Sequence, residues 1–304
     1  MTFRLMSSFI QKHLIPYSLP FLAVVLIVVL ICFIVRRAKL SWQKNYREPF
    51  HHALLRPAGW GCIKRREDAL FDIAAITVAL PALWACWAMI ELHGSRQSSI
   101  GTGIAFFIAS VFLIRTLRKR VVDARTAYLG YLGELAVAES LEPLTNQGWK
   151  VFHDFVMPGA KKPYNIDHIV VGPTGVFAIE TKARSKQPKE KSCNNEAQVD
   201  YDQVIFPCGR RLMPMKQAKG CARALRDWLN DKGVDVAFVN PVAVLPGWTL
   251  NYKTVKASRE IRDPRNLASY IRDSTSSLNS AKLEKAVIEI EKHCRSIKFA
   301  DVGF

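Results

Sequence analysis

The stretch from Asn165 to Lys182 constrains the fold more than any other part of the chain. Two runs of β-branched and aromatic residues flank the four-residue segment Gly172-Pro-Thr-Gly175. Proline fixes φ at the value that a type I or type II turn requires, so this pattern predicts a β-hairpin. If Gly172 pairs with Gly175, the register places Asp167 opposite Glu180, and opposed residues share one face of a sheet.

This register sets two carboxylates close together, with a lysine beside them. The Cβ atoms of Asp167 and Glu180 would lie about 5 Å apart, and Lys182, opposite Asn165, would follow one step along the same face. Opposed like charges destabilise a sheet, so a divalent cation, a proton shared between the acids or the lysine ammonium must compensate them. In the functional interpretation the acids hold Mg²⁺, which lowers the pKa of a bound water, and Lys182 orients that water or stabilises charge on a phosphate. The structural alternative is an ion pair between Lys182 and one acid.

Three apolar runs in the first 120 residues predict a membrane region. The run from Leu19 to Val35 carries no charged residue and would be about 26 Å long as a helix, close to the thickness of the bilayer core. We expect spans at about 19–36, 69–92 and 98–117. The alternatives are a cleaved signal peptide for the first run, and a buried amphipathic helix or re-entrant segment for the third.

The distribution of lysine and arginine predicts how these spans are oriented. The segment between the first two runs is rich in both residues, the short loop from His93 to Gln97 contains only Arg96, and Arg118, Lys119 and Arg120 follow the third run. By the positive-inside rule, we expect a multi-pass protein of the cytoplasmic (inner) membrane, with residues 1–120 as the membrane region and residues 121–304 as a cytoplasmic domain.

The large net positive charge of the chain is only weak evidence for a nucleic-acid partner. The 304 residues carry a formal charge of +17, of which residues 1–125 contribute +11 and the remainder only +6. Most of the basic charge is therefore explained by membrane topology. The cytoplasmic part is mildly basic, which permits a polyanionic partner but does not require one.

Seven cysteines are scattered along the chain, and none forms a Cys-x-x-Cys pair. A zinc site built from Cys193, Cys208, Cys221 and a histidine is weakly supported, because close ligand pairs are missing. Cytoplasmic placement favours reduced thiols over disulfides.

The pattern of the second half predicts an α/β domain with a mixed central sheet. We expect a helix that ends before Pro143, a first strand, the hairpin, a mobile polar loop, a helix that opens at a proline, two short buried strands and two final helices. Their expected bounds are 125–141, 149–156, 165–182, 183–202, 214–229, 234–239, 242–245, 264–273 and 281–297.

Two further polar residues, Glu134 and Gln217, lie on helices that we expect to pack near the hairpin. Glu134, in the first helix, could supply a third carboxylate from above the sheet, or be a solvated glutamate. Gln217 lies in the first turn of the helix that Pro214 opens, where it could donate to a phosphate or to a metal-bound water. The alternative is an exposed helical glutamine.

Four motifs together resemble the nuclease-related domain (NERD) family. They are Gly133-Glu134 in the opening helix, Val151-Phe-His-Asp154, the whole run from Asn165 to Lys182, and Pro214-Met-Lys-Gln217. This family is grouped with the PD-(D/E)xK nucleases, which have the restriction-endonuclease-like fold. The resemblance covers about Tyr128 to Leu229, and its hairpin portion is the most specific.

The resemblance implies a phosphodiesterase that depends on Mg²⁺ or Mn²⁺. It assigns Asp167 and Glu180 as metal ligands, Glu134 as an additional carboxylate, Lys182 as the group beside the attacking water, and Gln217 as a supporting polar group.

The sequence departs from the family pattern in two places. Ile166 stands where the superfamily name has a proline, which leaves the chemistry intact. The segment before Gln217 begins Leu-Met-Pro in place of the usual Asn-Pro, which puts the role of Gln217 in question.

We therefore expect a membrane-anchored nuclease acting on DNA, in defence or DNA processing. Its phosphate contacts would come from Lys161, Lys162, Arg184 and Lys186. The alternative is a non-catalytic module of the same fold that binds nucleic acid or protein at the bilayer. A transporter-like protein is disfavoured, because the spans hold no cluster of ionisable residues. A homo-oligomer is left open.

Overall fold

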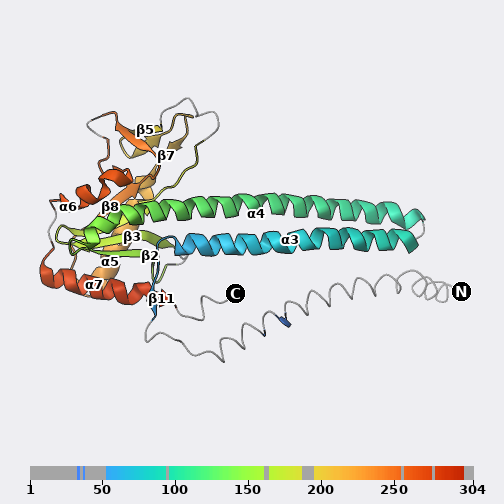
Figure 1. The fold of residues 1–304 in the computed structure, drawn as a ribbon, viewed down its shortest axis with the longest axis horizontal. Helices are drawn as coiled ribbons and strands as arrows, with labels where there is room; N and C mark the ends of the chain where they lie inside the picture. The colour runs from blue at the N-terminus through green and yellow to red at the C-terminus, as the bar shows by residue number, and fades with distance from the viewer. Residues whose placement is uncertain are drawn as a thin grey trace. The chain divides into compact units, whose positions relative to one another are not determined.

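The computed structural model of the protein describes residues 33, 34, 37, 53–93, 96–160, 164–186, 195–254, 257–275 and 278–297 (Figure 1). The chain divides into two compact units. The first consists of residues 1–49, 67–124 and 299–304, and the second of residues 50–66 and 125–298. Residues 50–66, which include the start of the first apolar helix at Trp60, thus belong to the α/β unit.

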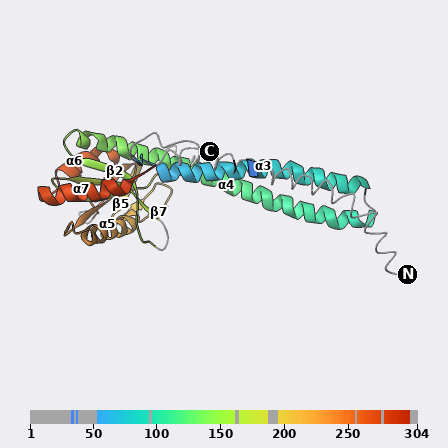
Figure 2. The ribbon, with the colours of Figure 1, turned by 90° about the horizontal axis from the view of Figure 1, so that it is seen from below.

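Two long helices, α3 (Trp60–His93) and α4 (Arg96–Thr145), are long and apolar enough to cross a membrane over Trp60–Ala88 and Gly101–Thr145. Within the first unit they run side by side (Figures 1 and 2). Large apolar side chains such as Phe71 and Phe112 are exposed along them, at 73% and 68%. The second and third predicted spans thus fall on apolar helices. The first predicted span, at 19–36, lies outside the described residues except for Phe33 and Ile34.

The predicted break at Pro143 is wrong. Helix α4 is continuous from Arg96 to Thr145 and includes Pro143, so the third apolar run and the helix that carries Glu134 form one element. Pro143 lies in the last turn, where it removes one backbone hydrogen bond and no further turn depends on it.

A mixed five-stranded sheet forms the centre of the α/β unit, as the sequence predicts. Its order is β10-β8-β4-β3-β2, with β2, β3 and β4 antiparallel and β4, β8 and β10 parallel. The hairpin register is confirmed, because Gly172 pairs with Gly175 and His168 with Ile179. The strands are β2 (Lys150–Val156), β3 (Asn165–Gly172), β4 (Gly175–Thr181), β8 (Val239–Val244) and β10 (Ile261–Arg262).

Helices cover both faces of this sheet (Figure 2). Helix α5 (Pro214–Asp231) and helix α7 (Ser280–Cys294) share one apolar core with it. The last turns of α4 and the short helix α6 (Leu267–Arg272), which follows a 3₁₀ turn at Pro264–Asn266, share a second core on the opposite face. The second unit is therefore a three-layer α/β arrangement.

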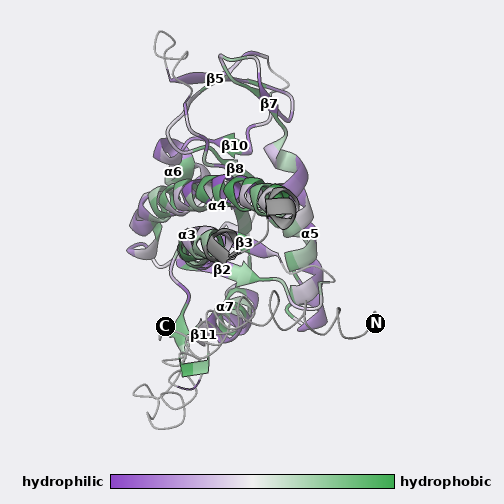
Figure 3. Ribbon diagram, turned by 90° about the vertical axis from the view of Figure 1, so that its right-hand side faces the viewer, coloured by the Kyte–Doolittle hydropathy of each residue, from purple (hydrophilic) through white to green (hydrophobic). Residues whose placement is uncertain are grey.

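A second sheet of four short strands was not predicted. Its order is β7-β6-β5-β9, and its strands are β5 (Glu196–Asp200), β6 (Gln203–Ile205), β7 (Arg211–Leu212) and β9 (Thr249–Tyr252). In Figures 1 and 3, β5 and β7 lie on the side of this unit away from α7. Strand β5 corrects the predicted mobile loop at 183–202, because Ala197 and Val199 alternate into a core of their own.

Two further boundaries differ from the sequence prediction. The two predicted strands at 234–239 and 242–245 are replaced by the single strand β8, and the last helix ends at Cys294, where the chain becomes strand β11 (Arg295–Ile297). Strand β11 pairs with β1 (Leu54–Leu55), which ties the segment before α3 to the end of the α/β unit.

Candidate active site

Asp167 and Glu180 lie buried on neighbouring strands, at 8% and 3% exposure. They stand one step beyond the pair formed by His168 and Ile179, so the register places them opposite one another. The backbone N–H of Thr181 donates to Oδ2 of Asp167 at 2.7 Å. Burial, followed by the charges of Glu180 and Glu134, raises the pKa of Asp167 well above its usual range. Each of the two acids therefore disfavours the charged form of the other, as the register predicts.

Lys182 bridges Glu180 and Gln217. Its Nζ atom donates to Oε1 of Glu180 at 2.6 Å and to Oε1 of Gln217 at 2.8 Å. Burial raises the pKa of Glu180, while the Lys182 ammonium and a hydrogen bond from Gln217 oppose that rise. Gln217 reaches this position because Pro214 starts α5 three residues earlier. The structure thus brings Asp167, Glu180, Lys182 and Gln217 together.

Cys221 also contacts this group and was not assigned a place in it from the sequence. It follows Gln217 by one helical turn, so the two side chains lie on adjacent parts of one helix face. Its Sγ atom lies 3.9 Å from Oε2 of Glu180. Burial and the charges of Glu180 and Asp167 raise the pKa of the thiol to about 12, so it is uncharged at neutral pH. The i, i+4 spacing from Gln217 was the available sequence signal.

Glu134 is buried at 5% exposure but is held by a different set of partners. The backbone N–H of Gly59 donates to its Oε2 at 3.0 Å, and the Cys62 thiol donates to its Oε1 at 3.1 Å. The guanidinium of Arg65 in turn contacts Cys62 Sγ at 3.0 Å. Helix α4 can approach this closely because residue 130 is a glycine, since a Cβ atom there would lie 2.9 Å from the same sulfur.

Asp154 is a further buried acid that anchors the same segment. It lies in β2 with a positive φ of 52°, a conformation that aspartate tolerates better than most residues. Asn165 donates to its carboxylate, as does the backbone of Gly61, and Arg56 donates to its carbonyl at 2.8 Å. Burial raises the pKa of Asp154, and Asn165 and Arg56 lower it. Its contacts join Arg56 and the first turn of α3 to the central sheet.

The chemistry of the acid pair suits a hard cation. Mg²⁺ and Mn²⁺ take carboxylate oxygens, and Mg²⁺ is often bound through one or two carboxylates plus water and substrate phosphate. In the part of the chain that the structure describes, Oδ1 of Asp167 has no hydrogen-bond donor, whereas Oε1 of Glu180 is held by Lys182. Asp167 and Glu180 would therefore hold such an ion.

The predicted third ligand is not assembled with this pair. Both oxygens of Glu134 accept hydrogen bonds from Gly59 and Cys62, and no group of three His, Cys, Asp or Glu side chains among the described residues is close enough to hold a metal ion. The charge of Glu134 still raises the pKa of Asp167, so the two acids interact electrostatically.

The predicted phosphate-binding residues fall in two places. Lys161 and Lys162 lie outside the described residues. Arg184 lies over the ring of Phe206 at 4.0 Å, and Lys186 lies 5.6 Å from the ring centre of Trp248. Both basic residues thus follow Lys182 along the chain and rest on aromatic side chains of the core that Ala197 and Val199 of β5 also join.

A histidine pair joins β2 and β3 on the other face of the sheet. The Nδ1 atoms of His153 and His168 are 2.8 Å apart, so one ring donates to the other. Burial lowers the pKa of His153 to about 4, and burial together with His153 lowers that of His168 well below its usual value. Both rings are neutral at neutral pH.

The span from the helix that carries Glu134 to the end of β8 contains all of these acids, Lys182 and Gln217. Residues 129–246 match the family model of the nuclease-related domain. The match excludes Gly59 and Cys62, which hold Glu134, and helices α6 and α7. No curated protein and no solved structure matches the chain. The match to the nuclease-related domain therefore covers less than half of the chain.

Proposed function

We propose that the nuclease-related domain of this protein hydrolyses phosphodiester bonds in DNA with the help of Mg²⁺ or Mn²⁺. The observation that carries this proposal is the buried pair of Asp167 and Glu180, with Lys182 joining Glu180 to Gln217 at 2.6 and 2.8 Å. A purely structural role would not require two buried, mutually repelling carboxylates beside a lysine.

Each side chain of the group has a separate task in this proposal. When bound, the metal ion would supply an acidified water and neutralise charge on the phosphate. Asp167 and Glu180 would hold the ion, and the Thr181 N–H fixes the orientation of the Asp167 carboxylate. Lys182, partly exposed at 29%, reaches from the buried Glu180 toward solvent, where it can contact the phosphate. Gln217 keeps the ammonium in place.

Glu134 acts through its charge. Its hydrogen bonds from Gly59 and Cys62 hold a carboxylate near Asp167, and this carboxylate strengthens the preference of the acid pair for a cation. Contact of Glu134 with the ion would require these hydrogen bonds to be shared or broken.

We further propose that the domain is anchored in the cytoplasmic (inner) membrane by α3, α4 and the apolar run at 19–36, and that it faces the cytoplasm. The exposed apolar side chains of α3 and α4 support this anchoring, and the lysine and arginine distribution supports the orientation. A reporter fused near Ser95 is expected outside and one fused after residue 304 inside. Cytoplasmic labelling of a cysteine at Ser95 would contradict this topology.

Cleavage by the full-length protein in detergent tests the chemistry. We expect duplex DNA to be cut with Mg²⁺ or Mn²⁺ and to remain intact with EDTA, and we expect Asp167→Asn and Glu180→Gln to lose the activity. Glu142→Gln, which removes an exposed acid of α4, is the matched control and should retain it. RNA and single-stranded DNA, assayed in parallel, identify the substrate.

The second candidate is a non-catalytic module that binds nucleic acid or protein. The Glu180–Lys182 ion pair favours it, because a lysine can compensate that acid without a metal. Metal-independent DNA binding without cleavage, unaffected by Asp167→Asn, would support this candidate against the nuclease.

A further inference from the structure

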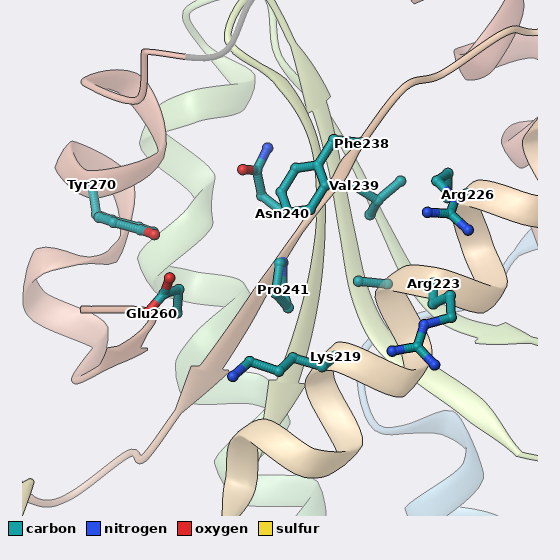
Figure 4. Close-up of a pocket in the computed structure, with 10 residues that line it drawn as sticks. Lys219, Arg223, Arg226, Phe238, Val239, Asn240, Pro241, Glu260 and Tyr270 are labelled. Carbon is teal, nitrogen blue, oxygen red and sulfur yellow. The ribbon is translucent and has the colours of Figure 1, made fainter. Parts of the chain in front are cut away.

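A groove lies on the flank of α5 that faces away from the acid pair. Its volume is about 390 Å³, within the range of small-molecule sites. One wall is α5, the floor is the start of β8 at Val239–Pro241, and the far wall holds Glu260 and Tyr270 (Figure 4). The floor is open because β10 pairs with β8 only at Ala243 and Val244.

The groove and the acid pair use opposite edges of α5. Lys219, Arg223 and Arg226 are spaced at i, i+4 and i+7, so they follow one edge of the helix and line the groove. Gln217, which contacts Lys182, is two residues before Lys219 and therefore points about 200° away around the helix. A nucleic-acid strand bound at the acid pair would have to cross α5 to enter the groove.

The α5 wall presents three cations, and none is bound to a buried acid. Among the described residues Arg223 has no hydrogen-bond or ion-pair partner. Lys219 pairs with Asp202 at 2.5 Å and Arg226 with the adjacent Asp227 at 2.6 Å, and these side chains are 38–56% exposed. Exposed ion pairs contribute little, so both cations can turn to a stronger anion. Such an arrangement suits a phosphate chain.

Aromatic and polar groups lie across from these cations. Phe238 is 59% exposed at the edge of the groove, a position that leaves its ring open for stacking. Tyr270 has one ring face covered by Arg262 at 4.1 Å, and its hydroxyl points toward the groove (Figure 4). Glu260 accepts a hydrogen bond from Ser258 and can also accept from an amino or hydroxyl group. The groove therefore offers cations for a phosphate chain, an aromatic ring for a base, and polar groups for the amino and hydroxyl groups of a nucleoside.

We propose that this groove binds a free nucleoside di- or triphosphate, with the phosphates on Lys219, Arg223 and Arg226 and the base against Phe238. Its size and its separation from the acid pair favour one nucleotide over a continuous strand. The proposal does not depend on the nuclease chemistry. A ligand at this position would contact α5, the helix that also carries Gln217 and Cys221.

Calorimetric titration of the full-length protein with ATP, in detergent and EDTA, tests the proposal. Arg223→Ala should weaken ATP binding by about tenfold or more, the size expected for losing one charged hydrogen bond. Phe238→Ala should weaken ATP binding by about tenfold but leave inorganic triphosphate unchanged, because only the base stacks. Adenosine alone should bind more weakly than ATP.

Lys292→Ala is the matched control, because it removes one exposed positive charge from α7, and it should leave ATP binding unchanged. Equal weakening by Lys292→Ala and Arg223→Ala would mean nonspecific attraction and would overturn the proposal, as would the absence of ATP binding. A short oligothymidine that competes with ATP and binds more tightly than ATP would assign the groove to a nucleic-acid strand. That result would also overturn the proposal.

Discussion

Two adjacent residues of β3 belong to two different buried clusters of ionisable side chains, and burial shifts the pKa values of the two clusters in opposite directions. Asp167 belongs to the acid pair with Glu180, and His168 belongs to the histidine pair with His153. Burial raises the pKa of the acids and lowers that of the histidines, since in each case it disfavours the charged form. The histidines become neutral and satisfy one another with a hydrogen bond.

The difference shows why burial alone does not mark a functional site. At neutral pH the histidine pair has no charge left to compensate. The acids repel one another, and Lys182 forms a hydrogen bond only with Glu180. The pair is therefore stabilised by binding a proton or a cation. A functional site is therefore indicated by charge that the fold leaves uncompensated. Four measurements test this contrast, in order of decreasing effect.

The largest effect is expected from acidification of the histidine pair. The pKa of His153 is 6.5 when unfolded and about 4 when folded, so below pH 6.5 the unfolded chain binds more protons and folding loses stability. The loss should reach about 3 kcal/mol near pH 4. His153→Gln, which can still bond to His168 but does not titrate, should lack this part of the loss and keep only the part that comes from His168, whose pKa is also lowered. Denaturant unfolding at several pH values measures it, and identical pH profiles for both proteins would contradict it.

The next effect concerns the acid pair. Mg²⁺ or Mn²⁺ should stabilise the wild type by about 2.7 kcal/mol at a hundredfold excess over the dissociation constant, because the ion binds only the folded state. Glu180→Gln should gain far less, and the control Glu142→Gln should gain as much as the wild type. Thermal unfolding with and without the ion gives both values. A wild type that gains nothing would leave the metal assignment without support.

A smaller effect on stability is expected at Glu134, a buried acid whose two oxygens both accept hydrogen bonds. Cys62→Ala removes the thiol that donates to Glu134 and should cost about 1 kcal/mol. Cys62→Ser retains a donor and should recover part of that loss. Chemical denaturation of the three proteins compares them. If serine and alanine are equally destabilising, the contribution of Cys62 is packing.

The smallest effect is expected for Glu180→Gln without metal. Burial outweighs Lys182 in its effect on Glu180, so the variant should be as stable as the wild type or slightly more stable at neutral pH. Because the folded pKa of Glu180 is raised, the wild type should improve relative to the variant as the pH falls through that value. A variant that melts clearly lower at neutral pH would identify Glu180 and Lys182 as a structural ion pair.

The local parts of the fold and site could be predicted from the sequence. The four-residue turn from Gly172 to Gly175 determined the hairpin register, and the same register placed Asp167, Glu180 and Lys182 together. Pro214 located the start of α5, and through it Gln217. These signals lie within a few residues of the positions that they determine.

The remaining parts depend on contacts between distant residues. Gly59 and Cys62 reach Glu134 across more than 70 positions, and no local pattern links them. The second sheet is built from strands of two to five residues, too short for alternation to distinguish them from a polar loop. For the same reason the pairing of β1 with β11 was not anticipated.

The position of residues 67–124 in the chain has a consequence for protein engineering. These residues form an insertion within the α/β unit, and the flanking positions remain close, since the Arg66 guanidinium lies 4.4 Å from the ring centre of Tyr128. Replacement of the insertion by a short linker would retain β1, Gly59, Cys62 and every acid of the candidate site. Truncation before residue 121 would instead discard the residues that hold Glu134. Excision, rather than truncation, is the route to a minimal version of this domain.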